Sequence, residues 1–273
     1  MTEGPEATHL RNYVARYFKG QRLRSIQIRA GRYKRHGIPP QMAAFQRHLP
    51  LQLQDVIKKG KVLFFRFEDG WTMIAKMGMT GWFSRSEDAR LFESEPSIVF
   101  QFDSGDLYWS DFRNFGTLTF TRDPTIVPEE LRQLAPDILD KSTTTTRVYD
   151  RVQNLQLAIR KPQLTLEEAL MDQGLVVSGV GNIIKSEALY DAKLSPRRTM
   201  KSMRKQNWSR VISSSRKISK KVLKYLEERD FTRANYMKLH RVYGRTKNSV
   251  GRDVRRYTAK DGRTTFWVPA VQH

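Results

Sequence analysis

The spacing of hydrophobic residues changes part-way along the chain. A first segment places Leu10, Tyr13, Val14 and Tyr17 on one face of a predicted helix. Short alternating or β-rich runs follow, separated by turn sequences such as Asp-Gly, and predict strands over 23–28, 62–67, 72–76, 98–102, 107–110 and 117–121. One helix followed by many short strands favours a β-sandwich or barrel.

The second half of the chain has helical spacing instead. Prolines 124, 128 and 136 punctuate the change, so we place a linker at about 121–130. Helices are expected over 129–134, 146–159, 165–172, 182–191 and 200–228. Beyond residue 242, strands at 254–258 and 264–268 flank a turn at 259–262 and predict a hairpin. The expected fold class is α+β, with domains 1–125, 131–241 and 242–273.

A glycine-containing loop joins two predicted helices at residues 171–187. Gly179 and Gly181 permit close backbone approach, Asn182 is a plausible N-cap, and the amides that open the second helix suit an anion such as phosphate. A dinucleotide-binding loop is disfavoured, because its third glycine would fall at Ile184 and a helix precedes the loop where a strand is required. A corner whose glycines serve packing alone remains an alternative.

Composition independently indicates a polyanionic partner. The 49 Lys and Arg against 28 Asp and Glu give a net charge of +21 and a sequence pI near 10.3. No apolar run approaches the ~18 residues of a membrane span, and the first residues do not read as a signal peptide. The chain has no cysteine, which excludes disulfides and cysteine-ligated metal and fits a reducing compartment.

Segments along nearly the whole chain resemble one protein family. They are Glu3-Gly4-Pro5-Glu6, Gly60-Lys61, Gly78-Met79-Thr80-Gly81, Asp111-Phe112-Arg113-Asn114-Phe115-Gly116, the glycine loop, Val242-Tyr243-Gly244-Arg245 and Gly262-Arg263-Thr264-Thr265-Phe266. In this order they resemble the formamidopyrimidine-DNA glycosylase/endonuclease VIII family, whose loop is the helix-two-turn-helix motif. The resemblance implies a monomeric base-excision repair enzyme, without cofactor or metal, that acts on double-stranded DNA containing oxidised bases or abasic sites.

The C-terminal hairpin resembles a zincless finger of endonuclease VIII-like members. In this family the hairpin usually carries four cysteines that bind zinc, whereas Val268 and Ala270 stand near the second cysteine pair here. Cross-strand packing of Tyr257, Phe266 and Trp267 must then hold it. Arg263 matches the finger arginine that grips phosphates beside the lesion.

The resemblance also implies a covalent mechanism. Relatives attack the sugar C1′ with the amine of an N-terminal proline exposed by Met removal, and this chain has Thr2 at that position. An α-amine is roughly one-seventh neutral at pH 7 and an ordinary lysine about 0.04% neutral, so a processed Thr2 is a usable nucleophile. Glu3 matches the proton-transferring carboxylate, Glu6 is expected to orient the amine, and Lys61 matches a hairpin lysine. Helix-dipole roles for both glutamates and a generic basic edge for Lys61 are the alternatives.

Further residues match the family's DNA contacts. Met79, Arg113 and Phe115 correspond to the trio that fills the space left by an everted nucleotide, although Met79 and Phe115 could instead belong to the core. In the glycine loop, Gly181 and Asn182 match phosphate contacts. Lys185 is expected to add charge there.

Lesion choice and catalytic competence stay open at this level. Residues 231–240 are short and lack glycine, unlike the long loop of oxidised-guanine specialists, which favours oxidised pyrimidines and hydantoins as substrates. Because position 2 is Thr rather than Pro, a catalytically impaired damaged-DNA-binding homologue is one alternative. A helix-two-turn-helix module outside repair is the other.

Overall fold

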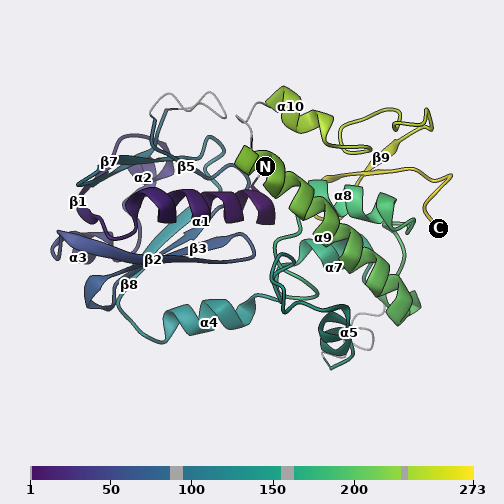
Figure 1. The fold of residues 1–273 in the computed structure, drawn as a ribbon, viewed down its shortest axis with the longest axis horizontal. Coiled ribbons are helices and arrows are strands. Elements are labelled where there is room, and N and C mark those ends of the chain that lie inside the picture. Colours follow the sequence, from purple (N-terminus) through teal and green to yellow (C-terminus); the bar gives the residue numbers. More distant parts are fainter. Residues whose placement is uncertain (1, 87–94, 155–162, 229–232) are drawn as a thin grey trace. The chain divides into compact units, whose positions relative to one another are not determined.

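The computed structural model describes residues 2–86, 95–154, 163–228 and 233–273. Their contacts divide the chain into two compact units (Figure 1). The first, here called the sheet unit, contains Thr2 with Glu6–Gln133, and the second, the helical unit, contains Glu3–Pro5 with Leu134–His273. No helix in the described ranges is long and apolar enough to cross a membrane.

The sheet unit is built from antiparallel strands and short helices. Its strands have the order β5-β7-β6-β1-β2-β3-β4-β8. Their bounds are β1 (Arg22–Ile28), β2 (Leu51–Lys59), β3 (Val62–Phe67), β4 (Thr72–Lys76), β5 (Trp82–Ser84), β6 (Ile98–Phe102), β7 (Gly105–Ser110) and β8 (Thr117–Thr121). The helices are α1 (Gly4–Phe18), α2 (Gly31–His36), α3 (Met42–Gln46) and α4 (Ile126–Gln133), with a 3-10 turn η1 (Glu68–Gly70).

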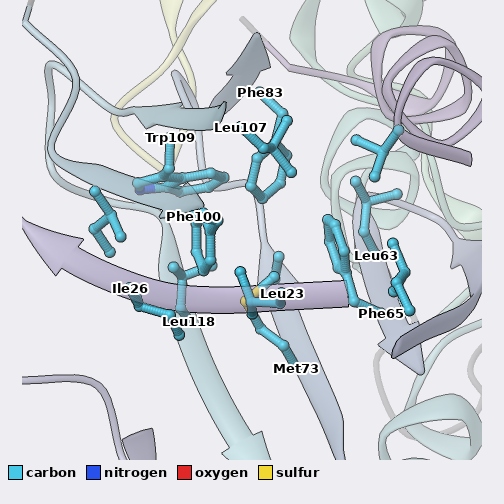
Figure 2. Close-up of a cluster of buried hydrophobic side chains, with 14 of the residues drawn as sticks. Leu23, Ile26, Leu63, Phe65, Met73, Phe83, Phe100, Leu107, Trp109 and Leu118 are labelled. Atoms are coloured by element: carbon cyan, nitrogen blue, oxygen red, sulfur yellow. The ribbon is translucent and has the colours of Figure 1, made fainter. Parts of the chain in front are cut away.

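These strands form the expected β-sandwich. β1 and β2 are paired at two positions only, Arg22 with Gln52 and Leu23 with Leu51. This short pairing joins two halves of the sheet, β5-β7-β6-β1 and β2-β3-β4-β8. Side chains from both halves meet in one core (Figure 2), where the rings of Phe65 on β3 and Phe83 on β5 lie 5.1 Å apart. Burial alternates along β7 because successive side chains point to opposite faces, whereas β3 and β4 are buried at nearly every position.

Sequence patterns located most of this unit. The first helix buries Leu10 and Val14 as expected, and each predicted strand is present within two residues of its predicted bounds. β2 and β5 were missed, since β2 ends in charged residues and β5 has three residues in all. The predicted linker over 121–130 overlaps α4, and the units divide after Gln133.

The helical unit packs its helices around an apolar core of its own. The core includes Leu170, Val180, Ile184, Trp208 and Val211. Its elements are α5 (Thr145–Asn154), α7 (Leu166–Met171), α8 (Asn182–Asp191), η2 (Met200–Ser202), α9 (Lys205–Glu228), α10 (Arg233–Lys238), β9 (Arg255–Thr258) and β10 (Thr264–Trp267).

Three sequence expectations in this unit either differ from the structure or lie partly outside the described ranges. The single helix expected over 200–228 is divided, because Met203 has an extended backbone between η2 and α9. The helix predicted for 146–159 is present to Asn154, and its last residues lie outside the described ranges. The short segment 231–240 was treated as a loop, but α10 occupies much of it, and residues 231–232 lie outside the described ranges.

Candidate active site and nucleic-acid interface

Thr2 is fixed within the sheet unit by two hydrogen bonds to the connection between β4 and β5. Its backbone nitrogen donates to the carbonyl oxygen of Met79 at 2.9 Å. Its hydroxyl donates to the carbonyl oxygen of Gly81, also at 2.9 Å. Thr2 is 2% exposed. The structure therefore holds the proposed nucleophile on the loop that carries Met79.

A second loop, residues 111–116, adjoins the Met79 loop. The Thr80 hydroxyl donates to the carboxylate of Asp111 and accepts from the backbone N–H of Arg113 at 3.2 Å. Gly78 lies so close that a Cβ there would stand 2.7 Å from the Phe115 carbonyl carbon. The predicted trio of Met79, Arg113 and Phe115 is thus carried by two loops in direct contact.

The exposure of these side chains speaks against a core role for the trio. Phe115 is 55% exposed, Arg113 is exposed and Met79 is partly buried. The Arg113 guanidinium carbon lies 5.0 Å from the centre of the Phe115 ring, within cation–π distance. An exposed cation stacked on an exposed ring is suited to contact bases and phosphates.

Lys61 and Glu6 occupy different settings in the same unit. Lys61 follows Gly60 in the tight turn between β2 and β3, and its carbonyl oxygen accepts from the N–H of Met77 at 3.3 Å. The turn is therefore bonded to the start of the Met79 loop. Glu6 lies in the first turn of α1 and is 2% exposed, so its carboxylate is buried.

Glu3 belongs to the helical unit and caps α8. Its carboxylate accepts from the backbone N–H groups of Ile183 at 2.9 Å and Ile184 at 3.0 Å. A Cβ on Gly181 would lie 2.4 Å from the carboxyl carbon of Glu3, which explains why glycine is needed there. A negative charge at the N-terminus of a helix is stabilised by its dipole and unpaired donors.

Two expectations about the glycine loop are therefore wrong. The N-cap position of α8 is Gly181 rather than Asn182. The N–H groups of Ile183 and Ile184 are not free to bind a phosphate, because both already donate to the carboxylate of Glu3. Phosphate contacts by Gly181 and the Asn182 side chain remain predictions.

Asn182 and Lys185 bind the C-terminal hairpin. The Asn182 side-chain amide donates to the carbonyl oxygen of Thr264 at 2.9 Å, while its Oδ1 is buried without a hydrogen-bond partner in the described residues. Lys185 is fully buried, and its ammonium group donates to the Thr265 hydroxyl at 2.8 Å. No part of the Lys185 side chain reaches the surface, and its expected contribution of charge for DNA stays a prediction.

Glu167 is the partner that makes this buried lysine tolerable. Its carboxylate accepts from the Tyr257 hydroxyl at 2.8 Å and from the Thr265 hydroxyl at 2.5 Å, and lies 3.7 Å from the Lys185 nitrogen. Burial lowers the pKa of Lys185, and Glu167 opposes that shift. Burial together with the hydrogen bond to Glu167 raises the pKa of Tyr257. These polar groups attach the hairpin to α7 and α8.

Arg263 directly precedes β10, the second strand of the hairpin. The turn closes through bonds from Gly262 N–H to Ala259 and from Ala259 N–H to Arg263, and Gly262 has a positive φ of 75°. The Arg263 side chain is 39% exposed, and its guanidinium is 3.8 Å from the Asp261 carboxylate. The hairpin thus presents a partly exposed arginine at its turn, as expected.

Sequence reasoning missed two buried carboxylates, Glu167, which binds side-chain hydroxyls of the hairpin, and Glu187, which binds backbone. Glu187 accepts from the N–H groups of Arg241, Val242 and Tyr243 at 2.8–2.9 Å. One signal was available for Glu187, because it lies four residues after Ile183 on the buried face of α8. An acidic residue at an apolar position of a helix indicates a buried acceptor role. In the described ranges, no group of three or more potential metal ligands is present.

An antiparallel sheet unit followed by a helical unit with a glycine corner and a terminal hairpin defines a protein of helix-two-turn-helix type. Residues 1–118 match the family model "Formamidopyrimidine-DNA glycosylase N-terminal domain", and residues 134–229 match "Formamidopyrimidine-DNA glycosylase H2TH domain". A formamidopyrimidine-DNA glycosylase of Pseudomonas syringae pv. tomato is 30% identical over 233 residues, which are 85% of this chain and 80% of that protein. The chain belongs to the formamidopyrimidine-DNA glycosylase family.

Solved structures agree on the fold. The crystal structure of MutM (Fpg) from Thermus thermophilus is 26% identical, with a TM-score of 0.79 over 99% of this chain and 98% of that one. Lactococcus lactis formamidopyrimidine-DNA glycosylase, solved with DNA containing an abasic site, is 22% identical with a TM-score of 0.80 over 99% of both chains. A helix-two-turn-helix module outside this family is thereby excluded, because the sheet unit matches as well.

Proposed function

We propose that this protein is a bifunctional DNA glycosylase and abasic-site lyase of base-excision repair. It removes oxidised bases from double-stranded DNA and nicks the abasic site that remains. Membership of the glycosylase family supports the substrate class. The net charge of +21 supports a DNA partner, since a polyanion is attracted over a long range.

The single observation that carries the mechanism is the position of Thr2. Its nitrogen is held against the Met79 carbonyl, next along the chain to the anchored Glu3. Removal of Met1 turns this nitrogen into an α-amine, which is roughly one-seventh neutral at pH 7. The amine attacks C1′ and the base leaves with the glycosidic electron pair. Loss of a proton from nitrogen and opening of the sugar ring then give the Schiff base.

The Schiff base makes strand cleavage possible. Once protonated, its nitrogen withdraws electrons, so a proton can leave C2′ while the 3′ phosphate departs in β-elimination. Proline would give an iminium with a permanent charge, whereas the imine of Thr2 must first take up a proton. We therefore expect a slower lyase than that of a proline variant, with the same products.

Glu3 supplies the proton transfer in this proposal. Its carboxylate is fixed by two backbone N–H groups, and Glu3 directly follows the nucleophile along the chain. Such a carboxylate can take up the proton that the attacking nitrogen loses and donate it to the ring oxygen as the sugar ring opens. Lys61 and Glu6 serve the same chemistry, Lys61 as phosphate ligand or general acid and Glu6 by orienting the amine.

Features of the C-terminal half support the subtype and substrate range that we propose. We assign the protein to the endonuclease VIII-like branch with a zincless finger, because the chain has no cysteine and the hairpin is bound to the helical unit through Glu167, Lys185 and Asn182. Oxidised pyrimidines and hydantoins are the preferred bases, and elimination continues to the β,δ product. Asn182, Gly181 and Arg263 contact phosphates, while Met79, Arg113 and Phe115 fill the vacated space.

Borohydride trapping tests this proposal. Protein with Met1 removed, as verified by mass spectrometry, is mixed with a duplex containing one abasic site and reduced with borohydride. A covalent adduct whose crosslinked peptide begins at Thr2 is expected, and it should be lost when Met1 is retained. The Thr2→Pro variant should trap faster, and Glu3→Gln should excise bases more slowly while still binding DNA.

The same experiment separates the rival function. If Met-free protein binds abasic-site DNA tightly but gives no adduct while Thr2→Pro does, the natural chain is a damage-binding homologue. An adduct on any lysine in place of Thr2 contradicts the assigned nucleophile. Cleavage of duplexes with oxidised pyrimidine, hydantoin or 8-oxoguanine measures the substrate preference.

A further inference from the structure

The loop of residues 111–116 presents an unusual amount of apolar surface. Four large hydrophobic side chains in the described residues are at least half exposed. Two of them, Phe112 at 50% and Phe115 at 55%, lie on this one loop of the sheet unit. Exposed aromatic residues gathered in one place indicate a binding surface.

The loop is anchored in a way that directs these rings outward. Asp111 is 4% exposed, and its carboxylate accepts from the Thr80 hydroxyl and from the Gly116 N–H. Asn114 has a positive φ of 57°, and its Oδ1 accepts from the N–H of Arg32 at 2.8 Å. Positions 111, 114 and 116 therefore face the protein, and the side chains between them are the exposed ones.

Gly116 fixes the end of the loop against the core. A Cβ at this position would stand 2.7 Å from the indole of Trp109, which is 1% exposed. A loop braced at both ends and in the middle loses little conformational freedom when a ligand binds. Phe112, Arg113 and Phe115 are thus a preorganised set, and Arg113 already stacks on Phe115.

The chemistry of this set fits one occupant. Two aromatic rings accept the faces of unstacked bases, and the arginine between them attracts the phosphate backbone. A protein partner or a second copy of this chain is disfavoured, because a net charge of +21 repels another copy and favours a polyanion. The bases of an intact duplex are already stacked, so rings of this kind select DNA in which a base has lost its neighbour.

We propose that Phe112 is a further DNA-contacting residue, which forms with Phe115 a two-ring stacking surface for bases left without a neighbour at a damaged site. The inference rests on the proposed function and adds a residue to it. Arg113 and Phe115 follow from the family resemblance. Phe112 follows from the exposure and anchoring of the loop.

Binding to two duplexes tests the role of Phe112. One duplex carries a tetrahydrofuran abasic analogue opposite 2-aminopurine, and the other has the same sequence without damage. Phe112→Ala should weaken binding about tenfold on the damaged duplex and less than about twofold on the intact one. It should also reduce the change in 2-aminopurine fluorescence on binding. Phe112→Trp, which keeps an aromatic ring, should restore both.

Ile38→Ala is the matched control, since Ile38 is 51% exposed in the same unit but lies outside the loop. It should leave both affinities unchanged. Equal affinities and fluorescence for wild type and Phe112→Ala overturn the inference while leaving the proposed function intact. An equal loss on both duplexes also overturns it, because that pattern indicates general disturbance. Wild-type protein without preference for the damaged duplex overturns the inference and the proposed function together.

Discussion

The two units hold their functional segments by different means. In the sheet unit, the loops that carry Met79 and Phe115 are extensions of strands packed on an aromatic core, with a single buried carboxylate, Asp111, joining them. In the helical unit, Glu3 and Glu187 bind backbone N–H groups that lie outside any strand pair, and Glu167 binds two hydroxyls of the hairpin. The carboxylates of this unit bind the N-terminus of α8, the hairpin and residues 241–243.

This difference has a simple physical origin. Strand pairing satisfies backbone groups as it forms, so a loop between strands begins and ends with its polar groups already bonded. Corners between helices leave several N–H groups without intrahelical partners. A buried carboxylate offers two oxygens that accept several such donors at once. The helical unit therefore holds these segments with a few acidic residues in addition to its apolar core, whereas the sheet unit holds its loops on strands packed over apolar area.

The largest loss of stability is expected when a buried apolar side chain of the sheet unit is shortened. Phe65 is fully buried in the core shown in Figure 2, so Phe65→Ala should lower the free energy of unfolding of the sheet unit by about 4 kcal/mol. Hydrogen-exchange rates of the β3 and β6 amides would report the stability of the sheet unit, and those of the α8 amides would report the stability of the helical unit. Phe65→Leu should cost under about 1.5 kcal/mol. Equal costs for the two substitutions would contradict close packing at this site.

Acidification should act mainly on the helical unit. His240 is 4% exposed, and burial, aided by Lys221 and Arg245, lowers its pKa from 6.5 to about 4. The unfolded chain therefore binds this proton first, and stability present above pH 6.5 is lost as pH falls to about 4. At about 1.4 kcal/mol per pKa unit, the loss is about 3 kcal/mol.

The His240→Phe variant isolates this contribution from other acid-sensitive groups. Urea unfolding of both proteins at several pH values gives the difference curve. The difference between wild type and variant should change by about 3 kcal/mol between pH 6.5 and pH 4. Parallel curves over that range would show that His240 titrates normally in the folded protein.

Removing one acceptor from Glu187 should have an intermediate effect. Glu187→Gln retains the volume but replaces one oxygen by a donor that faces backbone N–H groups. We expect a loss of about 2 kcal/mol in the helical unit and faster hydrogen exchange at Val242 and Tyr243. Unchanged exchange at these amides would show that the carboxylate is not what holds the segment.

The smallest change in stability is expected at an exposed glutamate, which is the control for loss of a negative charge without loss of a buried acceptor. Glu228 on α9 lies 3.6 Å from Lys224, and both side chains are largely exposed. Glu228→Gln should change the unfolding free energy by less than about 0.5 kcal/mol. A loss similar to that of Glu187→Gln would mean that net charge, rather than burial of the acceptor, stabilises the unit.

The sequence predicted what depends on local pattern and missed what depends on contacts distant along the chain. The strand β3 and the helix α8 have their predicted bounds, because their hydrophobic spacing and turn residues act locally. Asn182 was expected as the N-cap, yet Glu3, from the other end of the chain, takes the amides it would have served. Lys185 was expected to add charge at the glycine loop, and its burial did not follow from the sequence, since lysine is rarely buried without a partner. Its partners are Glu167 and Thr265, and no local pattern connects them to it.

The capping of α8 by Glu3 has a consequence for the life of the chain on the ribosome. The two residues joined by the Glu3–Ile183 bond are separated by 180 positions, and Gly4 also donates to Gly179. Until those later residues have been synthesised, nothing in the helical unit can fix the first residues in place. The cap on α8 therefore forms only after residue 184 has been synthesised, so the first residues of the chain are among the last to reach their bonded positions.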